Sequence, residues 1–231
     1  MKLFPLSDNL VFRYLRVDYS PDFISHIELQ GINLPSDFGK MVLKRRCEFL
    51  AGRACAHQAL TYLGHETTEC IGIGIGNAPV WPEHFVGSIS HCVGHAVASV
   101  AHYSEDVAGI GIDIEKVMSR QWANQLSSQI VSLNELHFVS QFDDVCQFLT
   151  LVFSAKEAIY KAIFPTVQQI LDFDSVILKQ VDCDKQELTF TTTPILDEYL
   201  NNEINIKVSY LMLGDAHYIT WCVIGEHHLK H

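Results

Sequence analysis

One short segment constrains the fold of this chain more than any other: the run Gly109-Ile110-Gly111-Ile112-Asp113-Ile114-Glu115. Its apolar and acidic residues alternate with a period of two, which is typical of a β-strand with one buried face. In such a strand Ile112 and Ile114 enter a core, whereas Asp113 and Glu115 share the opposite face. The two glycines before the acidic pair allow another backbone to come close. A solvated strand face is the alternative interpretation of the acidic pair.

A second run, Phe153 to Lys161, has the spacing of a helix. Glu157 and Lys161 are four residues apart, so they lie one turn apart on the same side of that helix. Taken alone, they are equally consistent with an ordinary helix salt bridge worth about 0.3 kcal/mol. Three carboxylates and a lysine, however, suit a hard cation such as Mg²⁺ that also holds a phosphate. The two runs together favour phosphoryl-group chemistry.

Composition narrows the classes of protein to which the chain can belong. Its 231 residues are 48% hydrophobic and 19% charged, as in globular proteins of one large or two small domains. The net charge of -11 argues against general nucleic-acid binding, because that affinity comes mainly from Lys and Arg. No signal peptide is recognisable, and no uncharged apolar run approaches the roughly 20 residues of a membrane span. Seven irregularly spaced cysteines predict free thiols in a reducing compartment. Together these features predict a soluble, cytoplasmic protein that binds no membrane.

The rest of the chain mixes helical and strand patterns without strict alternation, which predicts an α+β fold. Strand-like pieces broken by prolines occupy residues 1–38, and a helix is expected from about Lys40 to Leu63. Alternating Gly and Ile residues from Ile71 to Asn77 lack the third glycine of a dinucleotide-binding motif and predict a strand. Further helices are expected at about 121–142 and 144–164, and antiparallel strands at 175–181, 187–193, 205–213 and 218–224.

Several side chains have the chemistry of an anion site. Ser90 and His91 do not fit a hydrolase, because adjacent residues on a strand point apart. A hydroxyl and an imidazole can instead donate hydrogen bonds to phosphate oxygens. Arg45, Arg46 and Arg53 lie on the first long helix and have the groups to clamp a phosphomonoester. The solvent-exposed side of an amphipathic helix explains these arginines equally well.

In their order along the chain, these segments resemble those of the 4′-phosphopantetheinyl transferases. The Sfp-like branch, and within it the type that serves enterobactin synthase, is the most similar. The matching blocks span the middle of the chain, from Lys44 to Lys161, and the strand-rich remainder matches more loosely. They are Lys44 to Arg53, Pro79-Val80-Trp81-Pro82, Gly87 to Cys92, Gly109 to Glu115 and Phe153 to Lys161.

The resemblance implies two α+β halves of similar topology, residues 1–105 and 106–231, related by a pseudo-twofold axis. Coenzyme A would lie in the cleft between them. The implied reaction moves the 4′-phosphopantetheine arm of coenzyme A to a serine of an acyl, peptidyl or aryl carrier protein. Adenosine 3′,5′-bisphosphate is the other product. The implied setting is siderophore or other nonribosomal peptide or polyketide synthesis by a monomer.

The family pattern also implies roles for the acidic residues of the second half. Asp113, Glu115 and Glu157 would hold Mg²⁺ against the pyrophosphate of coenzyme A. Glu157 would be the base for the carrier serine, and Lys161 would contact the pyrophosphate and stabilise the leaving group. The carrier protein is expected to dock on an apolar patch in the region from Gln121 to Phe138.

For the first half, the pattern implies binding of phosphate, most readily the 3′-phosphate, by Ser90 and His91. Arg45 and Arg53 would be further clamps, and Arg45 is preferred to Arg46 because its spacing to Glu48 matches the family. The chain departs from many relatives in having Asn77-Ala78 where they have a cation before a proline. A non-catalytic coenzyme A-binding protein and a metal-dependent phosphodiesterase are the alternative functions.

Overall fold

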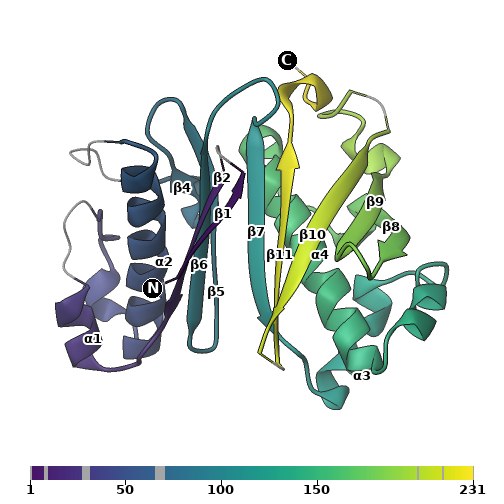
Figure 1. Cartoon of the computed structure of the whole chain (residues 1–231), viewed down its shortest axis with the longest axis horizontal. Coiled ribbons are helices and arrows are strands. Elements are labelled where there is room, and N and C mark those ends of the chain that lie inside the picture. The colour runs from purple at the N-terminus through teal and green to yellow at the C-terminus, as the bar shows by residue number, and fades with distance from the viewer. Residues whose placement is uncertain are drawn as a thin grey trace. The chain divides into compact units, whose positions relative to one another are not determined.

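The structure, a computed structural model, divides into two compact units, Met1–Tyr103 and Ser104–His231. It describes residues 2–7, 10–27, 32–65, 71–201, 203–214 and 216–230, the first of these ranges by its backbone alone. Each unit has its own antiparallel sheet and one long helix, so the predicted α+β fold class is confirmed (Figure 1). The predicted domain boundary follows residue 105, and the two units divide after Tyr103.

The first unit is built on a four-stranded sheet of order β1-β2-β6-β5. The helix α2 (Leu43–Tyr62) covers one face of this sheet and packs on β6, β2 and β5 (Figure 1). Small buried side chains on α2, Ala51 and Cys55 among them, let the helix lie close to the strands. The remaining elements of this unit are β1 (Lys2–Ser7), β2 (Leu10–Arg16), α1 (Pro21–His26), β3 (Gly72–Ile73), β4 (Pro79–Val80), β5 (Phe85–Cys92) and β6 (His95–His102).

The helix predicted from about Lys40 to Leu63 is therefore confirmed as α2. The strand predicted from Ile71 to Asn77 is only partly right, because β3 ends at Ile73. A turn follows in which Gly76 and Asn77 both have a φ of 64°. Extended strand geometry cannot accommodate such angles, and the chain turns back to pair β3 with β4.

The second unit is built on a five-stranded sheet of order β7-β11-β10-β9-β8. The helix α4 (Val145–Val167) packs on β7 and β11 and also contacts β10 (Figure 1). Its buried residues, such as Leu149 and Ile159, share an apolar core with strand residues such as Phe190 and Val208. The strands and the second helix are β7 (Gly109–Lys116), α3 (Arg120–Ile130), β8 (Val176–Asp182), β9 (Glu187–Thr192), β10 (Asn205–Leu213) and β11 (His217–Ile224).

The four predicted C-terminal strands are confirmed, whereas the helix predicted at about 121–142 is wrong in its second half. The helix α3 ends at Ile130, and a separate 3-10 turn spans Leu136–Gln141. The helix α4 continues past Pro165 to Val167, three residues beyond the predicted end, and stops where Gln168 takes a φ of 51°.

The two units share a topology, as predicted for the two halves of the family fold. In each, the first strand of the shared pattern pairs antiparallel with the last strand of the unit: β2 with β6, and β7 with β11. The long helix lies between these two strands in the sequence and packs on both of them. Each unit therefore buries one helix against one sheet around its own core.

The closest approach of α4 to β7 depends on two glycines. A Cβ atom at Gly111 would lie 1.7 Å from the carbonyl oxygen of Ala158, and one at Gly109 would lie 2.3 Å from that of Ala162. Both distances are shorter than real Cβ contacts, so only glycine fits at these positions. We refer to these four residues as the glycine–alanine contact. The backbone that the glycines of the sequence were predicted to admit is thus that of α4.

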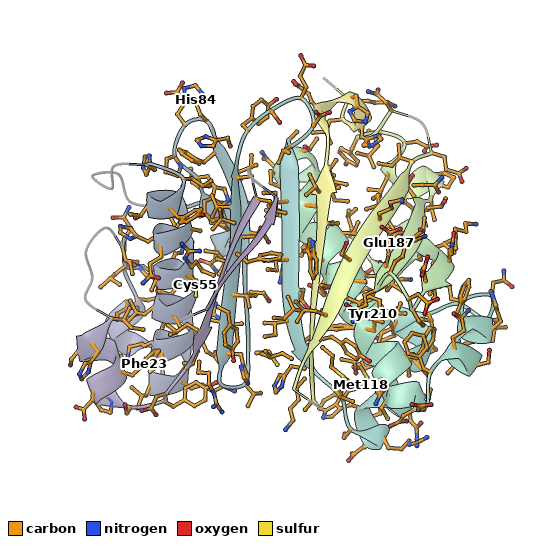
Figure 2. All side chains as sticks on the ribbon, in the orientation of Figure 1. Phe23, Cys55, His84, Met118, Glu187 and Tyr210 are labelled. Atoms are coloured by element: carbon orange, nitrogen blue, oxygen red, sulfur yellow. The ribbon has the colours of Figure 1, made fainter. Side chains whose placement is uncertain are left out.

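The buried thiols agree with the prediction of free cysteines. Cys55, on α2, points into the first unit, where its Sγ lies 3.8 Å from the carbonyl oxygen of Ala96 (Figure 2). Burial raises the pKa of Cys55 and of Cys222 to about 12, so both thiols stay protonated. Across the described helices, none has both the length and the apolar composition of a membrane span.

Candidate functional site

Asp113 lies at the centre of a buried polar group in the second unit. The alternation of β7 turns its side chain towards α4, and the residue is 2% exposed. Its Oδ1 accepts a hydrogen bond from Lys161 Nζ at 2.7 Å, and its Oδ2 accepts one from Ser154 Oγ at 2.8 Å. Ser154 is fixed in turn by a 2.9 Å hydrogen bond with Thr220 on β11. Two residues of α4 therefore hold both oxygens of this carboxylate.

Glu157 lies on the same stripe of α4, three residues after Ser154 and four before Lys161. The pKa of Glu157 is raised, mainly because its carboxyl group is removed from water. The negative charge of Asp113 raises the pKa further, and the ammonium of Lys161 opposes both effects. We refer to Asp113, Ser154, Glu157 and Lys161 as the acidic centre.

Glu115 lies on the same face of β7 as Asp113, two residues further along, and is half-buried opposite Tyr218 of β11. The strand and the helix thus present all three predicted carboxylates from facing elements. Within the described part of the chain, no three His, Cys, Asp or Glu side chains lie close enough together to bind a metal ion without moving. The metal-binding role of these carboxylates stays a prediction.

The acidic centre has the chemistry that a magnesium ion requires. Its donors are carboxylate oxygens, which hard divalent cations prefer over nitrogen or sulfur ligands. Asp113 and Glu157 are close enough for the charge of one to raise the pKa of the other. A divalent cation beside them would relieve this repulsion, so the residues present fit the ion that the family pattern implies.

The predicted phosphate-binding residues of the first unit divide between the two faces of β5. Arg45 Nη1, on α2, donates a hydrogen bond to His91 Nε2 at 2.6 Å. Ile89 lies on this same face, against Gly52 of α2. Ser90 is buried and lies between Ile89 and His91 in the sequence, so its side chain points to the opposite face of β5. The structure brings Arg45 to His91 but does not bring Ser90 to them.

Arg53 occupies a different environment from Arg45. It is 4% exposed, and its Nη1 donates hydrogen bonds to the carbonyl oxygens of Ile71 at 3.1 Å and Gly72 at 2.8 Å. Burial lowers the pKa of its guanidinium to about 10. These contacts hold the start of β3 against α2. Of the two neighbouring arginines at the start of α2, Arg45 rather than Arg46 makes the hydrogen bond to His91.

Two residues beside His91 were not predicted as part of the site. Glu48 is 7% exposed, and its Oε2 lies 3.7 Å from His91 Nδ1. The hydroxyl of Tyr19 donates to Glu48 Oε1 at 3.0 Å and accepts from the backbone N–H of Gly94 at 2.7 Å. The only sequence signal was the three-residue spacing of Arg45 and Glu48, since Tyr19 lies far away in the chain.

Lys156, next to Glu157 in the sequence, belongs to a second buried network. Its Nζ lies 2.9 Å from Glu135 Oε1 and donates to the carbonyl oxygen of Phe173 at 3.0 Å. Glu135 also accepts the backbone N–H groups of Ser132 at 2.7 Å and Leu178 at 2.8 Å. The network ties α4 to the segment that leads into β8.

A cavity of about 290 Å³ lies beside α4, between the helix and residues 170–176. Its helix side includes Glu157 and Tyr160, and its other wall includes Leu171 and Phe173. The lining is mainly apolar, and its charged residues are Lys156 and Glu157 on the helix and Asp172 on the other wall. The sequence did not predict this cavity, because residues 170–176 carry no recognisable motif.

Comparison with known proteins gives the same identification over both units. A family model described as the 4′-phosphopantetheinyl transferase N-terminal domain matches residues 35–101. A second, for the 4′-phosphopantetheinyl transferase superfamily, matches residues 109–222. These ranges contain the Arg45–His91 pair and the acidic centre, respectively.

Individual relatives match shorter stretches of the chain. Enterobactin synthase component D of Salmonella typhimurium is 41% identical over 122 residues, which cover 52% of this chain and 48% of that protein. The 4′-phosphopantetheinyl transferase Npt of Nocardia iowensis is 40% identical over 136 residues, 58% of this chain and 59% of the relative. The transferase Svp of Streptomyces mobaraensis is 32% identical over 166 residues, 66% of this chain and 60% of the relative. The chain thus spans about half the length of the first of these curated relatives.

Among solved structures, the holo-[acyl-carrier-protein] synthase of Neisseria meningitidis matches 51% of this chain and 98% of its own. The sequence identity of that match is 20% and its TM-score is 0.38.

Proposed function

Because the chain belongs to the 4′-phosphopantetheinyl transferase superfamily, we propose that it transfers the 4′-phosphopantetheine arm of coenzyme A to an apo carrier protein. The acceptor is a serine hydroxyl, and adenosine 3′,5′-bisphosphate is released. The observation that carries the proposal is the acidic centre, where Lys161 Nζ contacts Asp113 at 2.7 Å beside Glu157. It combines a base, a cation and oxygen ligands within one strand–helix pair.

In this reaction the serine oxygen attacks the phosphorus that carries the pantetheine arm, and the bond to the bisphosphate breaks. Negative charge accumulates on the oxygens of the leaving group and must be compensated. Lys161 supplies a positive charge at the acidic centre, held in place by Asp113. Glu157 takes the proton of the serine hydroxyl, and its raised pKa makes it a stronger base than an ordinary carboxylate.

Asp113, Glu115 and Glu157 are the residues that would hold Mg²⁺. When bound, the ion neutralises charge on the pyrophosphate oxygens and orients them. The Arg45–His91 pair of the first unit is the proposed site of the 3′-phosphate: the guanidinium of Arg45 donates to phosphate oxygens, and His91 accepts one of its N–H groups and orients the others. Arg53 contributes to this site indirectly, by holding β3 against α2.

The cavity beside α4 is proposed to receive the pantetheine arm. Glu157 of the acidic centre is among its lining residues, together with apolar side chains such as those of Ile159 and Leu171. We propose that the carrier docks on and just after α3, where Trp122 and Leu133 are 58% and 88% exposed. The name of the relative from Salmonella typhimurium supports carriers of siderophore or other nonribosomal peptide synthesis as the substrates.

The test is transfer of the phosphopantetheine group to an apo carrier domain, followed by mass spectrometry of the carrier. With Mg²⁺ and coenzyme A, the wild-type protein should add the mass of this group to the serine. Glu157→Gln should lower the rate about a thousandfold or more, since it removes the base and one ligand, while the fold persists. Glu83→Gln is the matched control, because Glu83 is an exposed carboxylate on a turn of the first unit.

Three results would contradict the proposal. A Glu157→Gln variant that works at the wild-type rate would remove Glu157 from the mechanism. Release of free phosphopantetheine without a carrier would identify a phosphodiesterase, and binding of coenzyme A without any product would identify a regulator.

A further inference from the structure

We propose that Glu48 and Tyr19 are positioning residues that set the orientation of His91 and so determine recognition of the terminal 3′-phosphate of coenzyme A. The inference rests on the proposed function, which assigns the Arg45–His91 pair to that phosphate. It adds two residues that contact no substrate themselves. Their role follows from the hydrogen bond that the imidazole makes on one side and the carboxylate that faces it on the other.

The tautomer of His91 is fixed by its contact with Arg45. A guanidinium has only donors, so in the 2.6 Å contact with Arg45 Nη1 the Nε2 atom of His91 must be the acceptor. The proton of the neutral ring then lies on Nδ1. That atom faces Glu48 Oε2 at 3.7 Å, which places a negative charge on the protonated side of the ring.

Glu48 is itself held rigidly. Its side chain is 9% exposed, and its second oxygen accepts the hydroxyl proton of Tyr19 at 3.0 Å. The Tyr19 oxygen accepts the backbone N–H of Gly94 at 2.7 Å, in the turn between β5 and β6. Tyr19 and Glu48 therefore connect α2 to the end of the strand that carries His91.

This chain of contacts has a consequence for ligand selection. A ring held by a buried carboxylate keeps Nε2 directed at Arg45, as partners of metal-bound histidines fix the ring of those residues, and so orients the guanidinium whose remaining N–H groups bind the phosphate. Loosening the carboxylate lets the ring turn and separates Nε2 from Arg45. Binding of the 3′-phosphate then weakens, whereas binding of the rest of coenzyme A does not depend on Glu48 or Tyr19.

The experiment compares coenzyme A with 3′-dephospho-coenzyme A, which differs only in the phosphate concerned. Calorimetry measures the Kd of each for the wild-type protein, Glu48→Gln, Tyr19→Phe and the control Glu83→Gln. We expect Glu48→Gln to weaken coenzyme A roughly tenfold and to leave dephospho-coenzyme A unchanged. Tyr19→Phe should act in the same direction with a smaller factor, and Glu83→Gln should change neither Kd.

In the transfer assay, the Glu48 variant should have a raised KM for coenzyme A and the wild-type kcat at saturation. A merely structural role would instead weaken both ligands equally or lower kcat, and either result would overturn the proposal. So would a wild-type protein that binds the two ligands with the same affinity. The binding measurement needs no turnover, so absence of transfer with a normal preference for coenzyme A would refute only the proposed function. Thermal unfolding checks each variant, and Tyr19→Phe decides the question if Glu48→Gln does not fold.

Discussion

Lys156 and Glu135 form an ion pair in which both side chains are 2% exposed. Removal of two charges from water is costly, and the pair is stable only because its remaining hydrogen-bonding groups are satisfied. Burial by itself would raise the pKa of Glu135. The ammonium of Lys156 and the backbone N–H groups of Leu178 and Ser132 outweigh burial, so the pKa of Glu135 is lowered.

Loss of one partner should therefore be far more harmful than loss of an exposed pair. Glu135→Ala leaves the Lys156 ammonium buried without its counter-charge and should lower the free energy of unfolding by about 3–5 kcal/mol. Lys207→Ala, which breaks the exposed pair with Glu187 (labelled in Figure 2), should cost less than about 1 kcal/mol. Urea unfolding of both variants measures the difference, and equal losses would contradict the assigned role.

The same pair has a predictable pH dependence. Because the pKa of Glu135 is lowered on folding, the unfolded chain binds more protons as the pH falls. The stabilisation by Glu135 is thus complete above its ordinary value of 4.5 and is lost as the pH falls through the folded value. The difference in unfolding free energy between wild type and Glu135→Gln should shrink below pH 4.5, as urea titrations at several pH values would measure.

Among the elements, α4 and β7 determine the geometry of the acidic centre. The glycine–alanine contact lets the helix axis approach the strand so closely that Ser154 and Lys161 reach Asp113 directly. The acidic side chains follow the glycines on the same face of β7. The spacing between helix and strand is therefore a condition for the proposed chemistry.

Gly111→Ala should destabilise the protein by about 3 kcal/mol or more, because its Cβ would lie 1.7 Å from a backbone oxygen that cannot move alone. Transfer activity should fall as well, since displacement of α4 separates Lys161 from Asp113. Gly39→Ala is the matched control, because a Cβ there meets nothing within 4 Å. If thermal unfolding finds the two variants equally stable, the proposed origin of the close approach is wrong.

The elements that could be predicted from the sequence are those with a clear local period. The alternation in β7 and the helical spacing in α4 placed Asp113, Glu157 and Lys161 on facing elements, as the structure has them. The sequence predicted one continuous helix at about 121–142, whereas the structure has a break after Ile130. This break depends on Glu135, whose carboxylate binds the N–H of Ser132 and also that of Leu178, 43 residues away.

Other parts of the site depend on contacts that no local pattern contains. Tyr19 reaches Glu48 across 29 residues, and the wall of the cavity at residues 170–176 is defined only by its packing against α4. Ser90 and His91 were expected to act together, but strand alternation places them on opposite faces of β5. The phosphate-binding roles of Ser90 and His91 stay predictions.

For the whole molecule, the net charge of -11 bears on the proposed encounter with a carrier protein, which we expect to be acidic as well. Two negatively charged proteins repel each other at long range, and salt screens this repulsion. The Debye length falls from about 30 Å at 0.01 M salt to about 8 Å at 0.15 M. Contacts at the docking surface itself are screened less than the long-range repulsion.

We therefore expect kcat/KM for the carrier to rise with ionic strength over this range, with coenzyme A saturating. The rise should be a few-fold and should reflect association rather than kcat. A carrier variant with surface acids replaced by lysines should show the opposite trend. A rate for the natural carrier that falls steeply with salt would instead indicate a local basic docking surface that outweighs the net charge.

The glycine–alanine contact also bears on how mutational scans of such proteins are interpreted. Gly109 and Gly111 offer no reactive group, yet replacement of either would be as damaging as replacement of a residue that touches substrate. A ranking of positions by mutational sensitivity alone would therefore group residues that only set the distance between helix and strand with residues that take part in the reaction. The two kinds of position can be told apart only by changing side-chain volume and side-chain charge in separate libraries.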